Sequence, residues 1–340
     1  MRKALTPLRL AIAGIVLLLV TVVLLMTTTT NSFLLIPDPA HPLAALVEVP
    51  GGKEQADNGG IYYVDVLEKK ASVLERLFPG IREGSTLVNH EDVTPPGITD
   101  QQRIQEDKRA MQISQQIASA VALKALGYNV KIKLDGVPVD EVSANADAAG
   151  KVQLGDIILA VDGKRVYTTP QLRAAVGKHK IGDPLHLRIR RNGKVVEVDV
   201  KATRDKDTGR PIIGIIADAN PALAVHLPLK IGFNLRNVGG PSAGLAFALQ
   251  ILEERGRDVD HGYRVAATGV IGPDGSVGPI GGVKQKTIGA RKAHVDVFLV
   301  PAGDNYREAK KYADGLRIIP VKSFQQALRA LATLPPKQQS

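Results

Sequence analysis

Two short glycine-rich segments hold a serine and two lysines, the residue types from which a nucleophile and its base can be built. The first is GGPSAG at 239–244, with Ser242, and the second is PIGGVKQK at 279–286, with Lys284 and Lys286. A serine hydroxyl needs a neighbouring base, and a lysine can serve where burial or positive potential lowers its pKa. Together the two segments predict a Ser/Lys hydrolase site.

Each segment lies where a turn opens a predicted helix. After the serine, apolar residues recur at helical spacing up to a predicted stop at Gly256, and Lys284 opens a second predicted helix that runs to about Ala293. Backbone N–H groups at the first start can stabilise an oxyanion. The positive end of the second helix disfavours an ammonium, which helps to lower the pKa of a lysine there.

The serine string and the stretch VIGPDGSVGPIGGVKQK at 270–286 resemble the proteolytic domain of the Lon family. The resemblance covers about residues 207–335 and implies a serine-type endopeptidase. It implies that Ser242 is the nucleophile and that Lys284 is the general base. Local chemistry alone leaves Lys286 as an alternative base, because the spacing does not exclude it.

Three further features bear on this site. By the resemblance, Thr268 places a hydroxyl beside the base lysine, although a threonine in a strand also serves as a packing residue. Lon proteases usually carry an acidic residue three positions before the serine, where this chain has Gly239. This departure leaves the organisation of the oxyanion region open. The histidines, among them His226, His261 and His294, show no metal-binding spacing, so we expect neither a metal nor a cofactor.

The first 35 residues predict a basic stub and a transmembrane signal anchor. Arg2, Lys3 and Arg9 precede an uncharged run of seventeen residues from Leu10 to Met26, which Thr27–Thr30 can extend across a bilayer. A cleavable signal peptide is the competing interpretation, but no A-x-A-like cleavage site follows. The basic residues place the N-terminus in the cytoplasm and the bulk of the chain outside a single-pass cell membrane protein.

Residues 36–127 show no catalytic chemistry. The proline-rich stretch 36–42 predicts a stiff, extended tether that holds the rest of the chain off the bilayer. Strands at 44–49 and 61–67, a helix at 71–77 and a long helix from Asp100, as its cap, to Leu126 are predicted to follow.

Residues 128–205 predict a compact β-rich unit with one helix at 169–176. The stretch GDIILAVDGKRV at 155–166 resembles a PDZ domain. PDZ domains bind an extended peptide along a strand edge. The resemblance implies a pocket built from the strand at 130–134 and from Leu172 and Val176 on the helix. A β-domain that acts only as a spacer is the alternative.

From about Pro211 the pattern changes to α/β, with a hairpin at 263–280, strands at 296–300 and 316–320, a helix at 305–313, and a last helix that Ser323 caps. The predicted fold class is therefore α+β multidomain. It comprises an N-terminal transmembrane helix, a β-rich PDZ domain and an α/β Lon-type proteolytic domain.

The composition of the chain limits the classes of partner that we expect. The chain of 340 residues has a net charge of +10, but its basic residues are dispersed and its aromatic content is only 4%, which argues against nucleic acid. It contains no cysteine and no G-x-x-x-x-G-K-[ST] phosphate loop, so neither thiol chemistry nor ATP is expected. The expected partners are polypeptide substrates and the lipid bilayer, with a homo-oligomer left open.

Two rival functions remain at this point. A non-catalytic, membrane-tethered PDZ adaptor would keep the fold with a degenerate site, yet both candidate residues are present. A trypsin-like PDZ protease needs a G-x-S-G-G string, which this sequence lacks, and has its PDZ domain after the protease domain.

Overall fold

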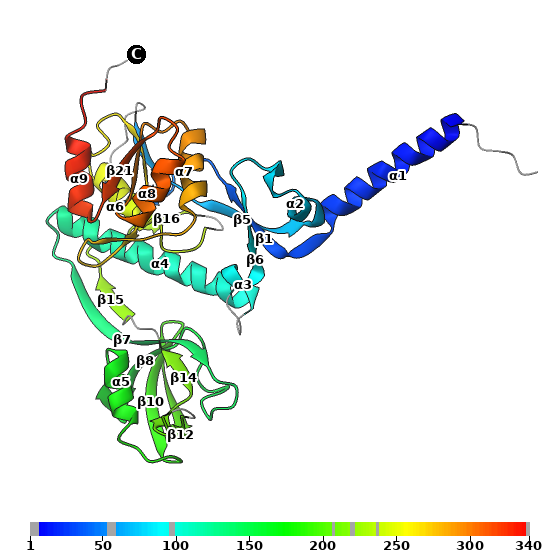
Figure 1. Cartoon of the computed structure of the whole chain (residues 1–340). Helices are drawn as coiled ribbons and strands as arrows, with labels where there is room; N and C mark the ends of the chain where they lie inside the picture. Colours follow the sequence, from blue (N-terminus) through cyan, green and yellow to red (C-terminus); the bar gives the residue numbers. More distant parts are fainter. Residues whose placement is uncertain are drawn as a thin grey trace, which may run out of the picture. The chain divides into compact units, whose positions relative to one another are not determined.

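The computed structural model describes residues 7–52, 59–94, 99–205, 208–217, 222–235 and 238–337. The chain forms two compact units (Figure 1). Unit 1 combines Met1–Asn129 with Leu227–Ser340, and unit 2 is Val130–His226. This division differs from the predicted segments 36–127, 128–205 and 207–335. The chain on both sides of the β-rich unit joins one body, and residues up to His226 belong to unit 2.

The first helix, α1 (Pro7–Thr27), is 21 residues long and carries exposed apolar side chains such as Leu17 and Leu24. Among the residues that the structure describes, none of the helices combines the length and the apolarity that crossing a membrane requires. The transmembrane anchor stays a prediction.

The predicted tether is part of the fold of unit 1. Strand β1 (Thr29–Pro37) lies between β5 (Val66–Ser72) and β6 (Thr86–Asn89) and pairs antiparallel with both. Its Leu34 is buried, and Ala40, inside the proline-rich stretch, is buried as well. Proline fixes the φ angle of the backbone but can still lie at the end of a paired strand. A proline-rich stretch is therefore compatible with paired strand ends as well as with an extended tether.

A five-stranded sheet forms the centre of unit 1, in the order β2-β4-β17-β20-β21. The strands β4, β17, β20 and β21 run parallel to one another, and β2 pairs antiparallel with β4. Their bounds are β2 His41–Pro42, β4 Gly60–Tyr63, β17 Arg264–Ala267, β20 Val297–Pro301 and β21 Arg317–Val321. Two strands therefore come from the N-terminal part of the chain and three from the C-terminal part.

Helices supply the remaining core of unit 1, and Phe247 and Phe324 on them are among its largest fully buried side chains. These helices are α4 (Asp100–Ala125), α6 (Gly244–Glu254), α7 (Val283–Lys292), α8 (Asp304–Lys311) and α9 (Phe324–Ala332). The predicted cap Ser323 is confirmed, because its hydroxyl accepts a hydrogen bond from the N–H of Gln326. The cap of α4 is Thr99 and not Asp100, because the Thr99 hydroxyl accepts from the N–H of Gln102.

Short elements complete unit 1. They are β3 (Val47–Glu48) paired with β16 (Gly232–Phe233), the hairpin of β18 (Val270–Ile271) and β19 (Val277–Gly278), and the helices α2 (Val73–Leu77), η1 (Pro79–Ile81) and α3 (His90–Val93).

Unit 2 is a β-rich body with one helix, α5 (Thr169–Val176), as predicted. Its main sheet has the order β11-β10-β8-β7-β14, with β15 also on β7 and β9 on β8, and β12 pairs with β13. The bounds are β7 Lys131–Val142, β8 Ile157–Val161, β9 Lys164–Arg165, β10 Pro184–Arg191, β11 Lys194–Lys201, β12 Thr203–Arg204, β13 Pro211–Ile212, β14 Ile215–Ala217 and β15 Ala222–His226.

The pocket predicted in unit 2 needs correction. Leu172 and Val176 are each only 4% exposed and pack in the hydrophobic core, so they do not line a surface groove. The start of β7, the other predicted wall, pairs with β15 through register partners such as Leu134 and Leu223. The helical spacing of the two apolar residues marks the core face of α5, which is what periodicity reports first.

Candidate active site

The nucleophile turn is held from two sides. Ser242 lies in the turn directly before α6, and its carbonyl oxygen accepts hydrogen bonds from the N–H of Gly269 at 2.7 Å and from the hydroxyl of Thr268 at 3.1 Å. Helix α4 holds the residues before it. The N–H of Gly240 donates to the carbonyl of Asp107 at 2.8 Å, and the hydroxyl of Ser114 donates to the carbonyl of Pro241 at 2.9 Å.

Lys286 is the lysine that meets the serine. Its Nζ lies 2.7 Å from the Oγ of Ser242, and the whole residue is only 5% exposed. Burial lowers the pKa of Lys286 from 10.5 to about 8, and the charge of Asp65 opposes this shift. A lysine with such a pKa is partly neutral near pH 8 and can accept the proton of the serine hydroxyl.

Lys284 lies elsewhere, so its predicted pairing with Ser242 is wrong. Its Nζ donates to the carbonyl of Ser85 at 3.1 Å and to the hydroxyl of Thr86 at 3.3 Å, and lies 5.8 Å from the centre of the Tyr312 ring. Residues two apart on an α-helix point about 200° apart, so only one of the two lysines can face the serine.

The sequence held a signal for this choice. Val283, Lys286, Thr287 and Ala290 follow the spacing i, i+3, i+4 and i+7, which marks one face of α7, and all four are buried. Lys286 therefore belongs to the face that packs against the protein. Lys284 shares its face with the basic Arg291, which lies seven residues further along the helix.

The two other predicted site positions have clear structural roles. Thr268 is fully buried, and its hydroxyl holds the backbone of the nucleophile, as described above. At Gly239, an added Cβ would lie 2.8 Å from the Cβ of Asp107. An acidic side chain there would collide with α4, so the glycine allows this helix to approach the serine turn.

A cleft of about 410 Å³ contains the reacting pair. Ser242, Lys286 and Asp65 are its polar members, and its apolar members include Leu35, Val66, Val238, Val270, Pro279 and Ile280. Leu35, Asp65 and Val66 come from the N-terminal part of the chain, which sequence reasoning assigned no site role. A single apolar or acidic residue in a strand carries no motif, so no signal pointed to these three.

Among the residues that the structure describes, two groups of side chains lie close enough together to share a metal ion. They are Asp38 with His41 and Asp65, and Glu253 with Asp258 and Asp260. In the first group an ion pair of 2.8 Å already joins His41 to Asp38, which explains their proximity without a metal. In the second, Glu253 accepts hydrogen bonds from the N–H groups of Val259 and Asp260. We assign no metal to either group.

Comparison with known protein families gives two matches along the chain. The model of the PDZ domain matches residues 124–202, and the model of the Lon protease (S16) C-terminal proteolytic domain matches residues 219–333. Ser242 and Lys286 both lie in the second range, whereas the N-terminal strands and α4 lie almost wholly outside both ranges.

Similar curated proteins include bacterial and human proteases. The chain is 35% identical over 89 residues to the serine protease Do-like HtrA of Lactobacillus helveticus, 37% over 103 residues to Lon protease 2 of Bacillus subtilis, and 29% over 198 residues to the mitochondrial Lon protease homolog of Homo sapiens. These matches cover 24%, 30% and 56% of this chain. The chain spans only 22%, 18% and 20% of the respective relatives.

Among solved structures, the PDZ domain of an SdrC-like protein from Listeria monocytogenes is 29% identical and covers 26% of this chain and 92% of its own. The corresponding domain from Listeria innocua is 30% identical and covers 24% and 93%. The TM-scores of 0.25 and 0.24 are too low to carry an argument about the fold.

The two family matches and the geometry agree on the main features. The described part of unit 1 contains a serine and a buried lysine in contact, in the range that matches a serine-type peptidase domain. The chain therefore combines a PDZ domain with the C-terminal proteolytic domain of the Lon proteases.

Proposed function

We propose that this protein is a serine endopeptidase in which Ser242 is the nucleophile and Lys286 is the general base. The observation that carries the proposal is the 2.7 Å contact between Lys286 Nζ and Ser242 Oγ inside the cleft. The lowered pKa of Lys286, about 8, supports the same assignment. Lys286 thus replaces Lys284 in the predicted mechanism.

In the proposed mechanism, neutral Lys286 takes the proton of Ser242 while the Oγ attacks a peptide carbonyl. Backbone N–H groups of the serine turn stabilise the resulting oxyanion. The lysine ammonium then gives its proton to the departing amine, and an acyl-enzyme remains. Water hydrolyses this ester by the reverse proton path, again through Lys286.

The proposed substrates are unstructured or misfolded polypeptides, cleaved without ATP. The sequence contains no phosphate loop that could drive unfolding. We propose that the PDZ domain binds an extended segment of the substrate, at a place other than the start of β7, and so presents it for cleavage.

An activity-based probe tests the proposed function directly. Purified protein is incubated with a fluorophosphonate probe and, in parallel, with fluorescently labelled casein. We expect covalent labelling and cleavage for the wild type and neither for Ser242→Ala. Unlabelled wild-type protein that still binds peptides would favour the non-catalytic PDZ adaptor instead.

We propose further that the chain is held at the cell membrane through its apolar N-terminal helix, with the catalytic unit outside the cytoplasm. Exposed apolar side chains support this placement. Helix α1 carries several, among them Leu17 and Leu24, and α2, which contacts α1, ends at the exposed Leu77. Protease added to intact spheroplasts should degrade unit 1. A catalytic unit that resists until the cells are lysed would contradict the orientation.

A further inference from the structure

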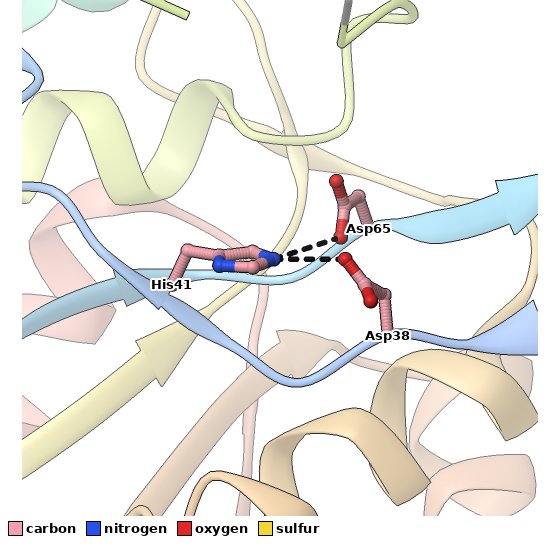
Figure 2. A group of neighbouring side chains, drawn as sticks. All are labelled: Asp38, His41 and Asp65. Atoms are coloured by element: carbon pink, nitrogen blue, oxygen red, sulfur yellow. Dashed lines mark hydrogen bonds and ion pairs between the residues drawn. The ribbon is translucent and has the colours of Figure 1, made fainter. Parts of the chain in front are cut away.

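Three ionisable side chains meet beside the proposed dyad: Asp38, His41 and Asp65 (Figure 2). The Nε2 of His41 lies 2.8 Å from Oδ2 of Asp38 and 3.9 Å from Oδ1 of Asp65. Figure 2 shows the imidazole pointing between the two carboxylates. Asp65 also lines the cleft that contains Ser242 and Lys286, so one member of this cluster faces the reacting groups.

Asp65 lies in an environment that disfavours its negative charge. Its side chain is 25% exposed, and its Oδ1 is buried and accepts no hydrogen bond from the described residues. Burial and the charge of Asp38 raise the pKa of Asp65, whereas His41 and Lys286 lower it. The carboxylate charge is therefore favoured by two basic side chains, and one of them is the proposed base.

The interaction is mutual. Among the described residues, Asp65 is the one charge that acts on the pKa of Lys286, and it favours the ammonium form against the effect of burial. The reaction itself needs both forms of the lysine: neutral when it takes the proton of Ser242, and charged while it holds that proton. A carboxylate at this wall stabilises the charged form when it arises.

The backbone fixes this arrangement. Gly289 lies one helical turn beyond Lys286 on α7, and an added Cβ there would collide with the carbonyl oxygen of Asp38. The N–H of Ala40 donates to the carbonyl of Gly289 at 3.2 Å. Helix α7 is therefore docked directly on the segment that carries Asp38 and His41, and the cluster and the lysine cannot shift independently.

We propose that Asp65 is a positioning residue for catalysis, which stabilises the ammonium of Lys286 within the shared cleft, and that His41 in turn stabilises the carboxylate of Asp65 against the neighbouring charge of Asp38. The inference rests on the proposed function. In the step concerned, the Oγ–H bond of Ser242 breaks as the Oγ–C bond to the substrate forms. The proton moves to Lys286 Nζ, stays there beside Asp65, and then passes to the departing nitrogen. Charge and protons balance within the site.

The test is the pH dependence of kcat/KM in the full chain, with a fluorogenic peptide that the wild type cleaves. The charged and titratable groups that act on Asp65 are Asp38, His41 and Lys286, and Tyr63 lies beside them with its own pKa raised to about 12 by burial and by Asp65 and Asp38. In Asp65→Asn, the loss of the negative charge should move the acidic limb to lower pH by about one unit. At the plateau, kcat should fall about tenfold.

Two conservative variants and one control complete the design. Asp65→Glu should restore both the limb and the plateau, and His41→Gln should move the limb in the same direction as Asp65→Asn by a smaller amount. Glu254→Gln is the control, because burial also raises the pKa of Glu254, which lies at the far end of α6 from Ser242. We expect this variant to keep the wild-type profile.

The outcomes separate this inference from the proposed function. An unchanged acidic limb in folded Asp65→Asn and His41→Gln would overturn the role of Asp65, while probe labelling of Ser242 would still support the dyad. Full activity in Ser242→Ala would instead overturn the proposed function. If EDTA changed the wild-type rate and Asp65→Asn abolished that change, the cluster would be a metal site, and the inference would be wrong.

Discussion

The two parts of the chain that build unit 1 contribute differently to the cleft. The C-terminal part, which matches the Lon proteolytic domain at 219–333, supplies Ser242, Lys286 and the apolar residues Val270 and Ile280. The N-terminal part lies almost wholly outside both family matches, yet it supplies Leu35, Asp65 and Val66 to the same cleft. The reacting groups come from one part, and much of their environment comes from the other.

This difference shows which parts of an active site a sequence motif can reveal and which parts it cannot. A catalytic motif records residues whose spacing along the chain is short, because the turn and helix that carry them are local. The supports of the serine turn are not local: Ser114 lies 127 residues before Pro241, which accepts its hydrogen bond. Such contacts are set by how one face of α4 packs against the turn, and they leave no fixed string in the sequence.

The largest expected effect tests the C-terminal part. Lys286→Ala should lower kcat/KM by about 10³-fold or more, because it removes the general base from Ser242. Lys284→Ala is the matched control on the same helix; it loses hydrogen bonds to Ser85 and Thr86 and should cost about 1 kcal/mol of stability while retaining activity. Peptide cleavage assays on both proteins decide the matter, and the reverse pattern would restore Lys284 as the base.

The next prediction concerns the junction of the two parts. Gly289→Ala would force a Cβ against the carbonyl of Asp38, so we expect a loss of about 3 kcal/mol in the free energy of unfolding. Activity should fall with it, because α7 carries Lys286. Gly80→Ala is the control, since its Cβ would meet no atom within 4 Å. Urea unfolding curves that coincide for Gly289→Ala and wild type would show that the two parts are not tightly docked.

A third prediction separates stability from activity. The folded pKa of Lys286, about 8, lies below its ordinary value of 10.5, so folding disfavours the charged amine. This cost is fully present below pH 8 and fades as the pH rises toward 10.5. Lys286→Met should therefore be inactive but more stable at pH 7, by about 2 kcal/mol. Thermal melts at pH 7 and pH 10 check this, and a gain that grows with pH would contradict it.

The smallest expected effect tests the support from α4. Ser114→Ala removes the hydrogen bond to the carbonyl of Pro241 and should cost about 1 kcal/mol of stability. Pro241 directly precedes the nucleophile. If the same amount, about 1 kcal/mol, is lost from the stabilisation of the transition state, we expect kcat to fall about fivefold. Ser119→Ala is the matched control: this hydroxyl bonds only the carbonyl of Gln115 among the described contacts, within the same helix. Equal activity of the two variants would mean that α4 does not organise the turn.

The sequence predicted well what local patterns determine. The helix at 169–176, the cap at Ser323 and the strand and helix order after residue 296 are confirmed, because each depends on residues a few positions apart. The turn at Ser242 was predicted from its glycine and proline spacing, and the structure places this serine beside Lys286. The α+β organisation with a PDZ domain and a Lon-type proteolytic domain is confirmed as well.

What could not be predicted depends on tertiary contact. Lys284 was predicted as the base because both lysines fit the turn; the helical spacing of Val283 and Ala290 favours Lys286, but only the packing of α7 shows that this face meets Ser242. The prolines of 36–42 suggested a tether, since composition cannot show that β1 and β2 find partners in unit 1. Leu172 and Val176 have the right spacing for a helix face, but spacing does not distinguish a groove from a core.

The parallel pairing of β4 with β17 has a consequence for the order of folding. The partners Gly60 and Arg264 are 204 residues apart, and all of unit 2 lies between them along the chain. Closing so long a loop is slow, whereas unit 2 is a continuous segment whose strands find partners nearby. During synthesis, unit 2 can therefore fold before β17 has been made and can pair with β4. The nascent chain can therefore complete its PDZ domain before its cleft, because the cleft residues from Val238 to Lys286 follow the whole of unit 2 along the chain.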